Sequence, residues 1–365
     1  MNKLDKTIWK IRCSSPFYIA KRDSLVWWKA WLIRLCAIVL ALGVCAVITI
    51  ALTKIDPMKL FAEMFKGAMG TKRRIWILLQ NTAILLCISL AVTPAFKMKF
   101  WNIGAEGQVL IGGLATAACV IYFGETMPYP LLLTVMVITS IIAGAIWGLI
   151  PAIFKAKFNT NETLFTLMMN YIAIQIVKYF TLEWSIPKGT EIPRPLEYGH
   201  LPILLDQKYL FNILVVVVIT VLMYIYLKYS KHGYEISVVG ESENTAKYIG
   251  INVKKVILRT MAISGALCGI AGLLLVAGTN HSIKNDMAGG RGFTAIMVSW
   301  LAKFNPIYMV LTAFMIAFLE EGSKKGIVER FGLNDAFSDI ITGIIIFFII
   351  GSEFFINYKI KRNKK

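Results

Sequence analysis

Residues 209–227 read YLFNILVVVVITVLMYIYL, and this run decides the fold class of the chain. It contains no charged side chain, and it is close to the roughly 20 residues that a helix needs to cross about 30 Å of hydrocarbon. Backbone N–H and C=O groups find no water in hydrocarbon, so such a run satisfies them only by forming a helix. The run therefore predicts a membrane-spanning helix.

Similar apolar runs fill most of the chain on both sides of this one. Of the 365 residues, 57% are hydrophobic and 16% are charged, and the mean hydropathy is +0.65. A soluble domain would have roughly 45–50% apolar and about 25% charged residues. We therefore predict an all-α, polytopic membrane helix bundle of about ten helices, some of them short or broken. The runs are 35–53, 75–96, 107–124, 126–154, 163–177, 209–227, 260–283, 292–302, 304–319 and 340–352.

The distribution of Lys and Arg gives the expected orientation, because loops rich in these residues stay in the cytoplasm. With the N-terminus inside and ten crossings, most of the 39 basic residues fall on the cytoplasmic side. The basic segment 54–74 is the exception, since this topology places it outside. We expect a basic cytoplasmic N-terminus over 1–34, a single transmembrane domain over 35–358 and a basic cytoplasmic tail over 359–365.

The net charge of +18 has a simple explanation in a membrane protein. Anionic lipids of the inner leaflet attract basic segments, so membrane lipids are expected partners. Binding of nucleic acid would need basic and aromatic residues interleaved on a soluble module, and the sequence has no such module. Nucleic acid is therefore not an expected partner.

The sequence contains no pattern typical of a catalytic or metal-binding site. Its six cysteines lie in apolar runs or alone in the basic terminus, and its three histidines are isolated from one another. Neither pattern has metal-ligand or disulfide spacing. A phosphate-binding loop with its lysine is also missing. We expect no cofactor and no catalytic site, so if transport consumes ATP, another chain must hydrolyse it.

Segment 100–108, FWNIGAEGQ, places polar side chains and two glycines between two apolar runs. One interpretation is a short cytoplasmic turn. The other is a broken, partly embedded segment that lines a path for solute, because non-helical backbone at membrane depth must be buried in protein or face a cavity. The candidate path residues here are Trp101, Asn102, Glu106 and Gln108.

Segment 161–171, NETLFTLMMNY, carries a second polar pattern. In a helix, Glu162, Thr166 and Asn170 share one stripe at spacings of four, which should face protein or water and not lipid. Hydrogen bonding between helices and contact with solute both explain the stripe. A weaker polar stripe in the run 75–96 adds Asn81 as a candidate.

Segment 233–251 lies in the longest polar interval between two strong spans. Ser242 is a good helix N-cap and Gly250 a good helix end, so a short, compact helix is expected between them. It is either a surface-resting amphipathic helix or a docking element for a partner protein. Docking is favoured because the segment has few basic residues to hold it on lipid. The candidate docking residues are Glu235, Gly240, Glu241, Ser242, Thr245, Ala246, Lys247 and Gly250.

These segments, in this order and followed by Asn305-Pro306, resemble the permease subunits of bacterial nucleoside-type ABC importers. That group also includes ribose and branched-chain amino acid permeases, and the resemblance covers about residues 75–350. It implies a multi-pass protein of the bacterial plasma membrane that forms the path for a nucleoside or related sugar. It also implies three partners: a separate ATP-binding subunit, a second related permease, and an extracytoplasmic substrate-binding protein or lipoprotein. Segment 233–251 matches the position of the helix that couples such permeases to the ATPase.

In such a path, Trp101 would stack on a planar base while Asn102, Gln108 and Asn170 pair with its polar edges. The alternative is an ion-coupled secondary transporter of a small polar solute. Such a transporter would want an acid near the middle of a span, whereas Glu106 and Glu162 lie near the ends of theirs.

Overall fold

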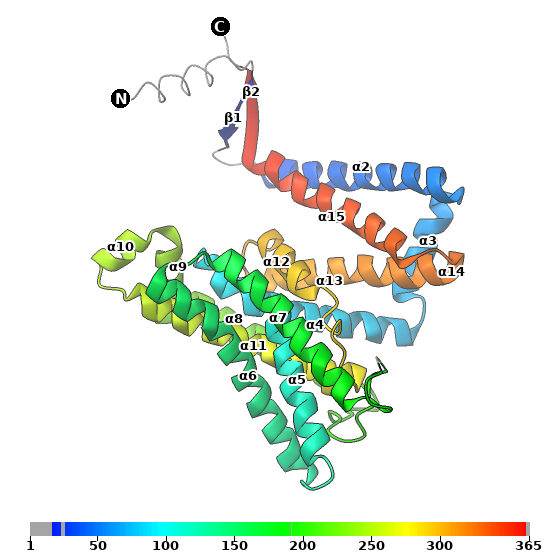
Figure 1. Ribbon diagram of the computed structural model, residues 1–365. Coiled ribbons are helices and arrows are strands. Elements are labelled where there is room, and N and C mark those ends of the chain that lie inside the picture. Colours follow the sequence, from blue (N-terminus) through cyan, green and yellow to red (C-terminus); the bar gives the residue numbers. More distant parts are fainter. Residues whose placement is uncertain (1–16, 23–25, 191, 363–365) are drawn as a thin grey trace. The chain divides into compact units, whose positions relative to one another are not determined.

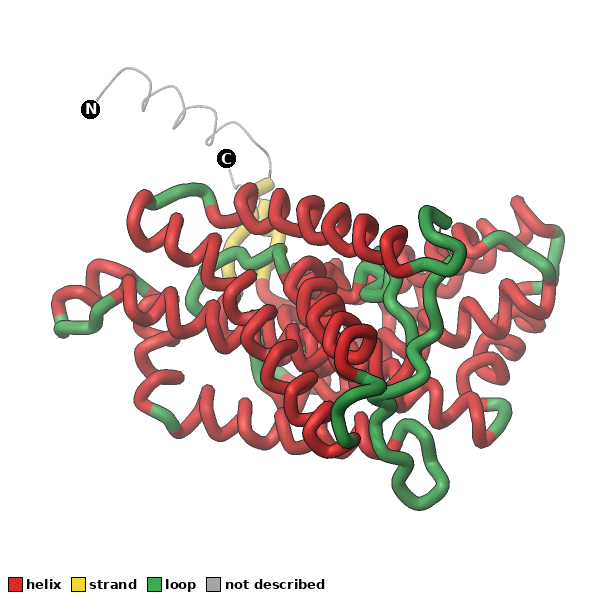
Figure 2. Tube along the Cα trace, turned by 60° about the horizontal axis from the view of Figure 1, so that its bottom comes forward, coloured by secondary structure: helices red, strands yellow, loops and turns green. Residues whose placement is uncertain are grey.

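The computed structural model describes residues 17–22, 26–190 and 192–362. In this part of the chain, strands occur in one antiparallel pair, β1 (Phe17–Lys21) with β2 (Tyr358–Arg362), and short loops join most of the helices (Figure 2). Nine described helices are long and apolar enough to cross a membrane. The all-α, polytopic fold is therefore confirmed.

Each of the ten predicted runs falls on a helix, and the run 292–302 corresponds to α12, which at 11 residues is too short to cross a membrane. The elements are α2 (Trp27–Thr53), α3 (Pro57–Met69), α4 (Lys72–Lys97), α5 (Ala105–Phe123), α6 (Tyr129–Phe158), α7 (Glu162–Trp184), α8 (Leu210–Tyr229), α9 (Lys231–Glu241), α10 (Glu243–Tyr248), α11 (Val253–Leu275), the π-helix η1 (Val276–Asn280), α12 (Arg291–Leu301), α13 (Pro306–Gly322), the π-helix η2 (Ser323–Val328), α14 (Glu329–Phe331) and α15 (Asp335–Asn357).

Some helices extend beyond the predicted runs, because a helix can include charged residues at its ends. Helix α2 begins at Trp27, so the expected boundary at residues 34 and 35 lies inside it. Helix α3 arises within the basic segment 54–74 because the Asp56 side chain accepts a hydrogen bond from the Met58 amide and Pro57 occupies the first helical position. The division into domains at 34 and 358 stays a prediction.

The chain forms two compact units. One consists of the described parts of 1–70 and 319–365. There, α2 packs along α15, and α3 packs against η2. Arg34 on α2 and Glu353 on α15 form an ion pair. Gly67 lies so close to the backbone of Gly326 that neither position has room for a side chain.

The second unit, residues 71–318, is built around α11, which packs against α4, α5 and α6 (Figure 1). Helices α6 and α11 cross closely, because Gly144 meets the Gly265 carbonyl and Gly269 meets the Ser140 carbonyl. Small residues let membrane helices approach closely and gain van der Waals contact. Two Gly-xxx-Gly pairs, 144/148 on α6 and 265/269 on α11, lie at this crossing.

Candidate functional site

The connector between α4 and α5, residues 98–104, is held by the side chain of Asn102. Its Oδ1 accepts hydrogen bonds from the Gly104 amide (3.0 Å) and from Gln108 Nε2 (3.3 Å), and its Nδ2 donates to Ser264 Oγ of α11 (3.2 Å). Asn102 and Gln108 are both buried. A buried amide that satisfies a turn in this way fixes the turn's shape. The connector is therefore a defined structural element.

Helix α7 holds the same connector from the other side. Asn170 Oδ1 accepts from the Gly107 amide and its Nδ2 donates to the Ile103 carbonyl, both at 2.8 Å. Thr166 Oγ1 accepts from the Ile103 amide at 3.2 Å. Glu162, at the start of the stripe, pairs with Lys155 at the end of α6 (2.9 Å). The predicted stripe thus faces protein, as expected, and each member binds a neighbouring segment of the chain.

Glu106 caps the short helix α12. Its Oε1 accepts from the Gly290 amide (2.8 Å) and its Oε2 from the Gly292 amide (2.7 Å). The first N–H groups of a helix have no partner within the helix and carry its positive dipole end, so a carboxylate there is favourable. Beside them, Arg291 donates to Asn81 Oδ1 at 3.2 Å. Two predicted path residues, Glu106 and Asn81, therefore both anchor the start of α12.

Trp101 is the one predicted path residue with a largely exposed side chain, at 43%. Its ring lies 5.5 Å from that of Trp300 and 5.7 Å from that of Phe96. Trp300, near the end of α12, was not among the predicted residues. The signal in the sequence was a tryptophan inside a short, amphipathic run, but no local pattern places it beside Trp101.

A helical knob, defined as residues 231–251, covers one end of the unit (Figure 1). It consists of α9 and α10. Ser242 Oγ accepts from the Thr245 amide at 3.2 Å, which confirms the predicted N-cap of α10. Gly250 has a φ of +84°, a left-handed conformation that glycine adopts without strain.

The inner face of the knob packs on the connector and the helix ends around it. Ile236, Val239 and Ala246 join a buried cluster that contains Met98 and Phe100. Glu235 forms a 2.8 Å ion pair with Arg259 of α11. Gly240 lies directly against the carbonyl of Lys97. The knob therefore contacts the residue that precedes Trp101, and three of the predicted docking residues, Glu235, Gly240 and Ala246, bind the chain itself.

The outer face of the knob carries the other predicted docking residues. Glu241, Thr245, Lys247 and Gly250 are exposed, and Ser242 is half-buried at the cap. Tyr248 and Ile249, which sequence reasoning missed, are 91% and 50% exposed. A large aromatic side chain so fully exposed at the end of α10 suits a protein contact.

Nine long apolar helices with a packed polar connector and a helical knob define a multi-pass membrane protein. Residues 75–350 match the family described as branched-chain amino acid transport system / permease component, and the chain belongs to this family. The resemblance noted from the sequence is thus confirmed.

Named relatives of the chain are permeases of ABC transporters. The guanosine ABC transporter permease protein NupP of Bacillus subtilis is 31% identical, covering 80% of this chain and 85% of that protein. The nucleoside ABC transporter permease protein NupB of Lactococcus lactis subsp. cremoris is 26% identical (87% and 90%). The glucose ABC transporter permease protein TsgB13 of Haloferax volcanii is 27% identical (91% and 90%).

Proposed function

We propose that this chain is the permease subunit of an ABC importer and forms the translocation path for a nucleoside or a related sugar. It lies in the plasma membrane with both termini in the cytoplasm, and it works with a separate ATP-binding subunit, a second related permease and an extracytoplasmic binding protein or lipoprotein. The observation that carries the proposal is similarity over 80% and 87% of the chain to permeases named for guanosine and for nucleosides. The glucose permease supports the sugar alternative.

The knob is the proposed contact with the ATP-binding subunit. Its outer face offers Tyr248 and Ile249 as apolar anchors, flanked by Glu241, Thr245 and Lys247. Its inner face is packed on Met98 and Phe100, so displacement of the knob must be passed to the connector. Packed elements of this kind move as rigid bodies, which suits alternating access driven by closure of ATPase subunits.

The connector is the proposed inner part of the path. Trp101 is exposed beside Trp300, so a planar base could stack on these rings. Asn102, Gln108, Thr166 and Asn170 are buried and bind the connector, and Glu106 with Asn81 binds the start of α12. We assign these residues to positioning the path, with Glu162 fixing the start of α7 through Lys155.

Reconstitution of the complete transporter tests the proposal. Proteoliposomes should take up radiolabelled guanosine only with ATP. The Tyr248→Ser variant should show about tenfold or more lower ATPase activity in the presence of the binding protein, because an aromatic anchor that becomes buried on binding contributes roughly 2 kcal/mol. Tyr229→Ser is the matched control, because Tyr229 is also exposed (68%) but lies outside the knob. Uptake driven by an ion gradient without ATP would refute the proposal and favour a secondary transporter.

A further inference from the structure

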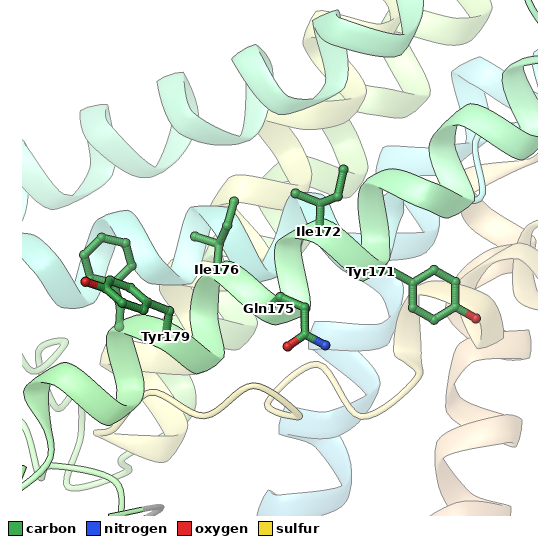
Figure 3. A pocket seen from close by; sticks show the side chains of 6 residues that line it. Tyr171, Ile172, Gln175, Ile176 and Tyr179 are labelled. Atoms are coloured by element: carbon green, nitrogen blue, oxygen red, sulfur yellow. The ribbon is translucent and has the colours of Figure 1, made fainter. Parts of the chain in front are cut away.

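Helix α7 presents a second stripe on the face turned away from the connector. Tyr171, Gln175 and Tyr179 follow one another at spacings of four and therefore share one side of the helix. All three are exposed, the two tyrosines at 59% and 64%. Figure 3 shows the amide of Gln175 between the two rings, while Ile172 and Ile176 point to another side. Gln175 lies near the middle of the span Glu162–Trp184.

Helix α8 of the same unit gives a comparison for the exposed side chains of α7. On α8, the side chains that are at least half exposed in mid-span are aliphatic, including Val217, Val218 and Leu222. An amide has hydrogen-bonding groups that hydrocarbon cannot satisfy, so polar side chains inside a membrane face protein or a water-filled cavity. Among described residues, no chain segment covers the exposed Gln175. Its surroundings in the membrane are therefore water or a partner protein, not lipid.

Two hollows follow each other along α7. One is an open, mostly apolar groove of ≈ 470 Å³ that extends from the stripe to the adjoining side of α7, where Ile172, Ile176 and Phe180 lie. The next, of ≈ 180 Å³, lies at the C-terminal end of the helix, where Lys178 and Thr181 meet Lys284 and Asp286 of the loop before α12. The second hollow is polar and reaches the loops, so water has access to it. The two hollows share no lining residue, but Leu182, which lines the second, follows Tyr179 by three residues on the same side of α7. The polar opening therefore borders the C-terminal end of the stripe.

We propose that Tyr171, Gln175 and Tyr179 line the aqueous part of the translocation path and contact a planar solute that has hydrogen-bonding edges. Residues four apart on a helix are separated by ~6 Å along its axis, so a solute held by the amide of Gln175 is within reach of both tyrosine rings. The rings offer faces for stacking and phenol groups for hydrogen bonds, and the amide both donates and accepts. The solute class rests on the proposed function, whereas the aqueous setting of the stripe rests on α7 alone.

Cysteine labelling tests the aqueous setting. In the assembled transporter, with exposed Cys36 and the terminal Cys13 replaced, Gln175→Cys is compared with Val218→Cys on α8. A water-soluble, membrane-impermeant thiol reagent reacts with thiolate, which forms in water and not in hydrocarbon. The Gln175→Cys variant should react about tenfold or more faster than the Val218→Cys variant. Equal rates would overturn the inference.

Uptake kinetics test the contact with solute. Gln175→Leu should raise the guanosine concentration for half-maximal uptake about tenfold, the loss expected for one hydrogen bond, with the thermal midpoint unchanged. Val218→Leu should leave uptake as in the wild type. An unchanged half-saturation in Gln175→Leu would overturn the contact while the proposed function stands. Failure of the wild-type transporter to take up any nucleoside or sugar would overturn the proposed function, and the labelling rates would still decide whether the stripe faces water.

Discussion

Replacing Glu106 by Gln measures how much the carboxylate that caps α12 contributes to stability. The amide keeps one oxygen for one of the two glycine N–H groups but turns its NH₂ toward the other, which loses its acceptor. Hydrogen bonds to a charged group contribute about 1.5–3 kcal/mol and neutral ones about 0.5–1.5 kcal/mol, so losing one and weakening the other costs about 3 kcal/mol. Glu106 is only 7% exposed, so the variant also avoids the free-energy cost of burying a charge. This offsets part of the loss and leaves a destabilisation of about 2 kcal/mol.

The thermal midpoint in detergent measures this loss. Buried Cys87, Cys119 and Cys268 become reactive toward a fluorogenic maleimide when the unit unfolds. For a unit the size of residues 71–318, each kcal/mol shifts the midpoint by roughly 2 °C, so Glu106→Gln should melt about 4 °C below the wild type. The matched control is Glu125→Gln, the same chemical change on an exposed loop. If both variants melt together, Glu106 does not stabilise α12 and the reasoning fails.

Two other predictions concern a helix crossing and an outer loop. Gly265→Ala should lower the same melting midpoint by about 2–6 °C, because its Cβ would meet the Gly144 carbonyl and overpacking costs about 1–3 kcal/mol. Gly43→Ala, which places its Cβ in open space, should leave the midpoint unchanged, and equal midpoints for the two variants would contradict close packing. The pKa of His281 lies below its usual 6.5 because the side chain is partly buried and lies near Lys208 and the His200 ring, whose centroid is 4.2 Å away. The unfolded loop therefore binds more protons than the folded loop, and the stability of the loop falls as pH drops below 6.5. Hydrogen-exchange protection of the Leu196 amide, which donates to the His281 carbonyl, should decline over that range in the wild type and stay level in His281→Asn; a decline in both would exclude His281.

The spans and helix caps were predictable because they depend on local properties. An uncharged run of sufficient length must be helical in hydrocarbon wherever it lies in the chain. The cap of α10 needs only Ser242 and the amide of Thr245 three residues later. In the same way, the stripe of Glu162, Thr166 and Asn170 follows from helical periodicity alone. The general positions of the connector and the knob could therefore be inferred from the sequence.

Contacts between segments could not be inferred, because they join residues distant in sequence. Asn170 binds the backbone around Gly107, and Glu106 caps a helix that begins at Arg291. Periodicity shows that a helix has a polar side but not which neighbour covers it. Most of the residues predicted to contact solute are buried in such pairings, whereas the exposed Gln175 carries no pattern in the sequence that distinguishes it from the residues around it.

The knob likewise combines features that are local in the sequence with contacts that depend on the tertiary structure. The sequence by itself determined that a capped, compact helix stands between two spans, because caps and charge-free runs are short-range features. Only the tertiary structure decided that Ala246 is buried against the chain's own core while Tyr248, two residues away, is 91% exposed. Two positions on one short helix differ by a rotation of about 200°, and packing against Met98 and Phe100 selects which side is covered.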